Sequence, residues 1–326
     1  MDVTIVIPTK NAGDQFRNVL TMILNQYTDL KYEVICVDSG SKDNTIEIIK
    51  SFPLVNLYQI NPEEFGHGKT RNYGALKGSG EFIVFITQDA LPINKYWLQR
   101  LVEAMKLDDC IAGGFGIHYP YKDCNVFDNR DITLHFKGFG EDNTIYYLKD
   151  KERYKVEEGY RHLLAYFSDN NSCLRRSVWE KIPYDDVDFA EDQIWAKKII
   201  ELGYKKVYTP FAGVYHSHNY NLSTYFQRYF DEYKGLYKLH NYKILASPLL
   251  IIPASCKHIL SDIRYIRSLE GITLKKKLYW TYYSIVRNIS RYTAGYIGSN
   301  YHRYSLKTQK RLDKAISQQY KQIKGV

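Results

Sequence analysis

The stretch VTIVIPTKN, residues 3–11, joins a run of β-branched residues to a polar turn. A second stretch of the same kind, residues 32–45, reads YEVICVDSGSKDNT. Continuous apolar runs of this length, bounded by turn residues, are typical of strands that are buried in a sheet. Both strands are therefore expected in the core of an α/β domain, each followed by a polar loop.

Strand and helix patterns alternate around these two stretches through the first 110 residues. We expect strands over residues 3–7, 32–38, 54–60 and 82–87, and helices over residues 14–26, 43–51 and 68–77. Strands separated by helices of this length predict βαβ units and a parallel sheet. Because the crossovers of such units are right-handed, the carboxyl ends of the strands are expected at one edge, where folds of this class bind ligands.

Three polar clusters are expected to meet at that edge: Pro8-Thr9-Lys10, Asp38-Ser39-Gly40 and Gln88-Asp89. Asp89 is well placed for a divalent cation, because Mg²⁺ takes one or two protein carboxylates and completes its shell with phosphate oxygens and water. The alternative for Asp89 is a cap ahead of a helix that starts near Ile93. Asp38 is not needed as a cap, and we expect it to accept the N3–H of a uracil or thymine ring.

The chain after residue 110 is less regular. Residues 118–160 have no assignable pattern, whereas a helix is expected over 191–202, a strand over 206–209 and mainly helices from Leu222 onward. The apolar run from Ile244 to Cys256 contains two prolines and is shorter than the roughly 20 residues that span a bilayer. No transmembrane helix is therefore expected.

Positive charge is concentrated near the C-terminus. The formal net charge is +9, with 19 Lys and Arg against 5 Asp and Glu in residues 221–326, and 26 against 31 in residues 1–220. We therefore expect two domains, a mildly acidic one over 1–220 and a basic, Tyr-rich one over 221–326. An anionic membrane surface or another polyanion is the expected partner of the second domain, and a solvated helical surface is the alternative. Residues 221–326 show no nucleic-acid-binding motif, so nucleic acid is not an expected partner.

The five cysteines are odd in number and widely spaced, so no disulfide framework is expected and a reducing cytoplasm fits best. The first residues have a strand pattern and not the charged and apolar segments of a secretory signal.

Four spaced motifs resemble glycosyltransferase family 2: Ile5–Asn11, Val37–Ser41, the acid Asp89 and the pair Glu191-Asp192. The resemblance covers residues 1–220. It implies the GT-A fold, a nucleotide-binding α/β domain, and leaves the mainly helical C-terminal extension outside.

Two further segments, FGHGKTRN at residues 65–72 and TQDALP at 87–92, are similar to the subgroup of this family that uses dTDP-L-rhamnose. Other family members have an aspartate at the position of Gln88, where it contacts the ribose. A thymidine nucleotide carries 2′-deoxyribose, which lacks one ribose hydroxyl. A carboxylate at that position would therefore have one hydrogen bond fewer to accept.

The resemblance also implies roles for single residues. The second acid of the pair, Asp192, is the expected base that takes the proton from the acceptor hydroxyl, and Glu191 is expected to orient the acceptor or a neighbouring backbone group. The alternative is that both are first-turn acids that complement a helix dipole. Arg71 and Lys10 are expected to contact the base or phosphates of the nucleotide, with surface positions as the alternative.

The sequence HSH, residues 216–218, suggests that His216 joins Asp89 on the cation. Imidazole fits Mn²⁺ better than Mg²⁺, and a hydrogen-bonded structural histidine is the alternative. His218 is the less favoured ligand.

These expectations combine into an inverting glycosyltransferase that moves L-rhamnose to a saccharide or lipid-linked acceptor and forms an α-L-rhamnoside. The basic extension would contact the membrane surface or another subunit of a homo-oligomer. The competing interpretations are a family 2 enzyme that uses a UDP-sugar, a nucleotidylyltransferase, and a non-catalytic protein that binds nucleotide sugars or polyanions. The loop after the first strand lacks the Gly-rich phosphate cradle that a nucleotidylyltransferase needs.

Overall fold

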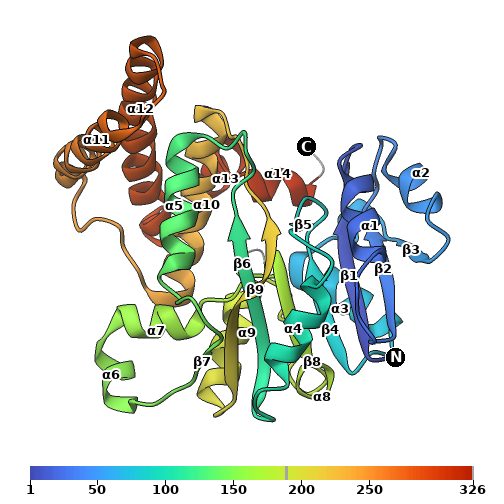
Figure 1. Ribbon diagram of the computed structural model, residues 1–326. Coiled ribbons are helices and arrows are strands. Elements are labelled where there is room, and N and C mark those ends of the chain that lie inside the picture. Colours follow the sequence, from blue (N-terminus) through green and yellow to red (C-terminus); the bar gives the residue numbers. More distant parts are fainter. Residues whose placement is uncertain (188–189, 325–326) are drawn as a thin grey trace. The chain divides into compact units, whose positions relative to one another are not determined.

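The computed structural model describes residues 1–187 and 190–324, and the side chains as far as residue 321. The chain divides into two compact units, Met1–His218 and Asn219–Val326 (Figure 1). We describe each unit separately.

The first half of the N-terminal unit is built as the alternating pattern predicts. Its strands pair in parallel in the order β3-β2-β1-β4. The bounds are β1 Val3–Thr9, α1 Phe16–Leu24, β2 Tyr32–Asp38, α2 Thr45–Lys50, β3 Val55–Gln59, the 3₁₀ turn η1 Pro62–Glu64, α3 His67–Lys77 and β4 Phe82–Ile86.

The second half of the sheet differs from the parallel arrangement of the first half. Strand β8, Asn171–Arg175, lies between β4 and β6, Ile111–Tyr119, and is antiparallel to both. Because Ile86 pairs with Asn171, the residues just before β8 lie at the same edge as the loop after β4. The parallel pairing expected for the strands of the first 110 residues is confirmed. Strand β8 comes from a later segment in which no strand was predicted, and its antiparallel direction brings a second loop to the edge that binds ligands in such folds.

The strand expected over 206–209 is longer than predicted. It is β9, Lys205–Tyr215, which runs parallel to β6. The two-residue strand β5, Leu91–Pro92, pairs with the end of β9, and for this reason the helix expected near Ile93 begins only at Trp97. The other elements of this unit are α4 Trp97–Met105, α5 Val126–Lys137, β7 Thr144–Tyr146, α6 Lys151–Val156, α7 Glu158–Ala165, α8 Arg176–Trp179 and α9 Glu191–Glu201.

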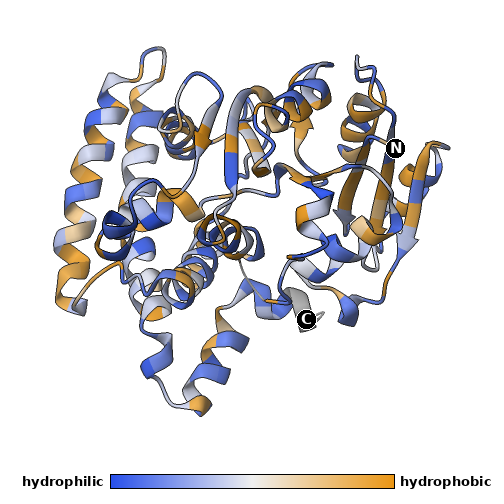
Figure 2. Cartoon of the chain, turned by 90° about the horizontal axis from the view of Figure 1, so that it is seen from below, coloured by the Kyte–Doolittle hydropathy of each residue, from blue (hydrophilic) through white to orange (hydrophobic). Residues whose placement is uncertain are grey.

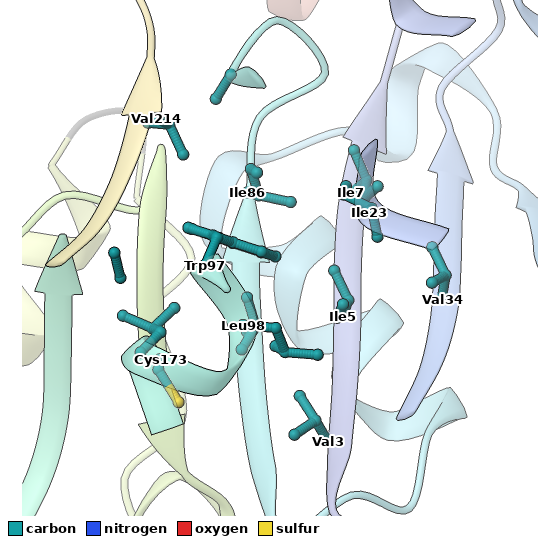
Figure 3. Packing of buried hydrophobic residues seen from close by; sticks show 14 of the residues in the cluster. Val3, Ile5, Ile7, Ile23, Val34, Ile86, Trp97, Leu98, Cys173 and Val214 are labelled. Atoms are coloured by element: carbon teal, nitrogen blue, oxygen red, sulfur yellow. The ribbon is translucent and has the colours of Figure 1, made fainter. Parts of the chain in front are cut away.

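Hydrophobic side chains fill both faces of the sheet. On one face, Trp97 and Leu98 of α4 lie beside Ile5 and Ile86 of the strands (Figure 3). On the other face a second cluster includes Trp195 of α9. Figure 2 shows the strands near the N-terminus almost entirely in the hydrophobic colour, as expected for strands that are covered on both sides.

The C-terminal unit is helical, as predicted. Tyr225 and Tyr233 of its first helix are buried against the core of the unit, which agrees with the helical spacing of these tyrosines. No helix within the described residues is long and apolar enough to cross a membrane. The elements are α10 Leu222–His240, η2 Pro248–Leu250, α11 Ile251–Ser268, α12 Leu274–Ser299, η3 Tyr301–Arg303, α13 Leu306–Ala315 and α14 Gln318–Lys324.

Candidate active site

The three polar clusters predicted from the strand ends do meet. Thr9 pairs with Asp38 in the register of β1 and β2. The Lys10 backbone N–H donates to Gln88 Oε1 at 2.8 Å, and Gln88 Nε2 donates to the Lys10 carbonyl at 3.1 Å. An amide can make this pair of bonds because it is both donor and acceptor, whereas an ionised aspartate can only accept.

Asp38 is fully buried and accepts four hydrogen bonds. Its Oδ1 accepts from the backbone N–H groups of Gly40 and Ser41, and its Oδ2 accepts from the hydroxyls of Ser41 and Thr9. Four donors occupy the lone-pair directions of a carboxylate. The expectation that Asp38 has no structural role is therefore wrong, because this side chain fixes the turn after β2.

The loop after β1 is held in place by the same turn. The Asn11 N–H donates to Ser41 Oγ at 2.8 Å, and Asn11 Oδ1 accepts from the Lys42 N–H at 2.8 Å. These bonds hold Asn11 in a left-handed conformation with φ of 48°, which is costly for a residue other than glycine. The Lys10 ammonium forms no salt bridge within the described part of the chain and is half-exposed beside this loop.

Asp89, His216 and His218 form a second group, which we call the cation cluster. One ligand atom of each lies within 4.8 Å of the others, with His216 Nε2 at 3.6 Å from Asp89 Oδ1 and His218 Nε2 at 3.4 Å from Asp89 Oδ2. Atoms that share a metal at about 2.1 Å stand roughly 3–4 Å apart, so the spacing fits one cation. His218, the less favoured ligand by sequence, lies as near to Asp89 as His216 does.

The cation cluster is open to solvent on one side. The side chain of Asp89 is 38% exposed and that of His218 36%, whereas that of His216 is 13% exposed. The Asp89 carbonyl accepts from the Tyr121 hydroxyl at 3.0 Å, and the ring Nδ1 of His216 lies 3.4 Å from the Asn170 amide. A His216 ring that ligates a cation through Nε2 carries its proton on Nδ1, and the Asn170 side chain would then accept a hydrogen bond from that N–H through its amide oxygen.

Arg71 lies in a third group, the buried carboxylate cluster, which also comprises Asp169, Glu191 and Asp192. Its Nη1 is 2.7 Å from Glu191 Oε1, its Nε is 3.2 Å from Asp169 Oδ2, and the residue is 5% exposed. This placement differs from the expected contact with a nucleotide. Two buried carboxylates need a countercharge, and the guanidinium supplies it.

Asp169 is the residue that sequence reasoning missed. Its Oδ1 accepts from the hydroxyls of Ser172 at 2.7 Å and Tyr184 at 2.8 Å, while its backbone N–H donates to Asp192 Oδ2 at 3.2 Å. Burial, followed by the nearby charge of Glu191, raises the pKa of Asp169 to about 6, although Arg71 opposes the shift. A polar run, Ser168–Asn171, directly before a strand was the signal that could have revealed it.

Asp192 stands at the start of α9, where Ala190 adopts a left-handed conformation with φ of 57°. Burial raises the pKa of Asp192 well above its usual range, and the charges of Glu191 and Asp169 add to the shift, while Arg71 opposes it. A carboxylate with a raised pKa is a stronger base than an ordinary one at neutral pH.

The segment FGHGKTRN packs closely against the residues before α9. A Cβ added at Gly68 would lie 2.4 Å from the Asp185 carbonyl, so only glycine fits there. Asn72 accepts from Trp179 Nε1 at 2.9 Å and donates to the Tyr184 carbonyl at 2.8 Å. The two residues hold α3 where Arg71 can reach Asp169 and Glu191.

Asp169 and Asn170 connect the two groups. The backbone of Asp169 contacts Asp192, and the side chain of the next residue, Asn170, contacts His216. The cation cluster and the buried carboxylate cluster therefore flank the same two residues. This arrangement suits a transfer reaction in which a charged group leaves on one side and a hydroxyl is deprotonated on the other.

Comparison with known proteins finds a matching family model and two similar enzymes. The model of the family described as glycosyl transferase family 2 matches residues 4–181. The O-antigen chain rhamnosyltransferase RfbN of Salmonella typhimurium is 34% identical over 235 residues, which cover 71% of this chain and 71% of that protein. The O-antigen chain rhamnosyltransferase WbaN of Salmonella anatum is 32% identical over 234 residues, 70% of each chain.

Two solved structures share the fold at low sequence identity. Residues 1–349 of S. aureus TarS align with a TM-score of 0.53 at 15% identity, over 93% of this chain and 92% of that one. The mannosyltransferase PcManGT from Pyrobaculum calidifontis, solved with GDP-Man and Mn²⁺, aligns with a TM-score of 0.53 at 19% identity, over 98% of this chain and 81% of that one.

Proposed function

Since the chain belongs to glycosyltransferase family 2, with the GT-A fold, we propose that it is an inverting enzyme that moves L-rhamnose from dTDP-L-rhamnose to a saccharide or lipid-linked acceptor. The observation that carries the proposal is the pairing of the cation cluster with the buried carboxylate cluster on either side of Asp169 and Asn170. The product of inversion at a β-linked donor is an α-L-rhamnoside.

The choice of donor is supported by Gln88. One lone pair of Oε1 and one N–H of Nε2 are engaged by the Lys10 backbone, so this side chain offers a ribose hydroxyl less accepting capacity than an aspartate would. A 2′-deoxyribose has no 2′-hydroxyl that needs a hydrogen-bond partner. A nucleotide sugar of this kind therefore loses no hydrogen bond when Gln88 stands in place of an aspartate. The relatives named as rhamnosyltransferases point in the same direction.

We propose that Pro8, Thr9 and Lys10 line the nucleotide and that Asp38 fixes their loop from beneath. The side chain of Asp38 is already saturated, so it supports the base site and does not itself bind the base. The free ammonium of Lys10 is available to the diphosphate.

Asp89, His216 and His218 would hold a divalent cation, Mn²⁺ in preference to Mg²⁺ because two of the three ligands are imidazoles. When bound, the cation offsets the negative charge of the leaving diphosphate. Tyr121 and Asn170 keep the ligands oriented, and the solvent-exposed side of the cluster leaves room for phosphate oxygens.

We assign the base to Asp192. Its carboxylate takes the proton of the acceptor hydroxyl as the oxygen attacks the anomeric carbon, on the face opposite the leaving diphosphate. Burial and then the charges of Glu191 and Asp169 raise the pKa of this base, and the charge of Arg71 opposes the rise. Arg71 and Glu191 are thus positioning residues and not contacts of the substrate.

The acceptor is proposed to be a growing cell-surface glycan, because the two relatives are named for O-antigen chains. We place the reaction in the cytoplasm at the membrane surface, since all five cysteines, each within the described residues, are free thiols and the C-terminal extension is strongly basic.

The donor is tested by calorimetric titration of TDP, dUDP, UDP and GDP with Mn²⁺ or Mg²⁺ and with neither. We expect metal-dependent binding of TDP and dUDP that is tighter than the binding of UDP, because both carry 2′-deoxyribose. Since dUDP lacks the methyl group of thymine, comparing it with UDP isolates the effect of the 2′-hydroxyl. A preference for UDP would replace rhamnose by a UDP-sugar. Binding of no nucleotide would favour a non-catalytic protein.

A further inference from the structure

The long helix α12 has a row of exposed apolar side chains along one side. Its members recur every three or four residues and therefore share one face of the helix. Leu278 is 64% exposed and Tyr282 is 63% exposed. We call this row the α12 stripe: Leu274, Leu278, Tyr282, Ile285 and Ile289.

The opposite side of α12 is buried inside the C-terminal unit. Ser284 and Asn288 donate to the buried carboxylate of Asp262 on α11, at 2.6 and 2.8 Å. The Ser255 hydroxyl donates to the Asn288 carbonyl at 3.4 Å, so the two helices run antiparallel. The two helices α11 and α12, which we call the hairpin, are thus held together by contacts between their facing sides, and the α12 stripe is not needed for that packing.

The charges on the surface of this hairpin are mostly positive. Lys275 and Lys276 lie next to the stripe in sequence and are exposed, as are Lys257, Arg264 and Arg267 of α11. Among the acids of residues 249–299, Asp262 is buried and Glu270 is exposed. At about 100° per residue, Lys275 and Lys277 fall on the two flanks of the stripe.

An apolar row flanked by lysines and containing a tyrosine is the pattern of a helix that lies in the headgroup region of a membrane. The lysine stems can lie along the acyl boundary while their ammonium groups reach the anionic headgroups. A second copy that packed through the same stripe would bring its own flanking lysines to the contact, and like charges repel. The charge complementarity therefore favours an anionic lipid surface.

We infer that the α12 stripe, with the exposed cations of the hairpin, docks the enzyme on an anionic phospholipid surface. The role of this contact, which is to bring the enzyme to a lipid-linked acceptor, rests on the proposed function. Its own evidence is the exposed row, the flanking charges and the independent packing of the hairpin.

The test is flotation of the full chain with vesicles of phosphatidylcholine alone or with about one-third phosphatidylglycerol, which hold neither donor nor acceptor. We expect binding to the anionic vesicles that weakens as salt rises. Leu278→Asn combined with Ile285→Asn should lower the binding at least tenfold, and Lys275→Glu combined with Lys277→Glu should also lower it. The matched control is Leu306→Asn on α13, which is more exposed than Leu278 or Ile285, lies outside the stripe and should bind like the parent.

Folding and donor binding are monitored separately in each variant. An unchanged circular dichroism spectrum and unchanged TDP binding would show that lost flotation comes from the stripe, and failure of TDP binding in the parent would affect only the proposed donor. The inference is overturned if the parent does not float with anionic vesicles, or if the Leu278 and Ile285 variant floats as the parent does. A parent dimer in sedimentation velocity that the same variant dissociates, without vesicle binding, would make a second copy the occupant and also overturn it.

Discussion

The cation cluster and the buried carboxylate cluster border the same two residues, yet they differ in solvation. The Asp89 side chain is 38% exposed, whereas that of Asp169 is 2% exposed. Charges near solvent are screened and rearrange when a ligand arrives, but charges in the interior interact strongly and must be balanced by the fold itself. The side chains of the first group can therefore rearrange around a ligand, and those of the second are set in place when the chain folds.

The largest expected effect is on the base. Asp192→Asn removes the proton acceptor and keeps the shape of the side chain, so the rate of transfer should fall by about 10³–10⁴. TDP binding measured by calorimetry should stay within a few-fold of the parent, because Asp192 belongs to the buried cluster and not to the cation cluster.

Glu201→Gln, at the other end of α9, is the matched control and should leave the rate unchanged. If the rate of the Asp192 variant were also unchanged, Asp192 would have no part in the mechanism.

The second effect separates the two groups by stability. Arg71→Met leaves Asp169 and Glu191 without a countercharge in the interior, and the free energy of unfolding in urea should fall by about 3–5 kcal/mol. Asp89→Asn removes a solvated carboxylate and should change the free energy of unfolding by less than about 1 kcal/mol.

The exposed ion pair of Arg100 with Glu103 provides the control, and Arg100→Met should cost less than about 1 kcal/mol. Equal losses in the Arg71 and Asp89 variants would contradict the distinction between an interior and a solvated group.

A smaller effect is expected for the two histidines. His216→Gln and His218→Gln should each weaken Mn²⁺ binding by about tenfold, because both rings lie within reach of Asp89. Calorimetric titration of Mn²⁺ measures this directly, with His302→Gln of the C-terminal unit as the control. Loss of affinity in the His216 variant alone would return His218 to the secondary place that the sequence suggested.

The sequence predicts the part of this fold that is encoded locally. The elements from Val3 to Ile86 follow from apolar runs and helical spacing, because each strand and helix there shows its own periodicity. The direction of β8 could not be predicted, since the sequence of a buried strand does not indicate its direction and only its long-range partners decide.

The candidate site divides in the same way. The strand-end clusters at Lys10, Asp38 and Gln88 were predictable from topology. The pairing of Arg71 with Asp169 joins residues 98 positions apart in the sequence, and no local pattern announces it. The saturation of Asp38 was also hidden, because it depends on the turn conformation of Gly40 and Ser41.

The last prediction concerns pH, because acid should act on activity and stability in opposite directions. Acidification protonates Asp192, whose pKa burial raises, so the rate of transfer should fall as the pH drops. The pKa of Asp169 is also raised, to about 6, so the folded state binds more protons than the unfolded state between pH 4 and pH 6. The stability that this group contributes is complete below its unfolded pKa and is lost as the pH rises through about 6.

Asp169→Asn separates the two effects. It removes a charge that raises the pKa of Asp192, so the acid limb of the pH–rate profile should move to lower pH. It also removes the proton uptake, so the gain of about 1–2 kcal/mol in unfolding free energy that the parent shows between pH 7 and pH 5 should shrink. An acid limb that stays in place would mean that Asp169 does not act on the base. Because the backbone N–H of residue 169 still donates to Asp192 in the variant, a shift can be ascribed to the lost charge and not to lost support.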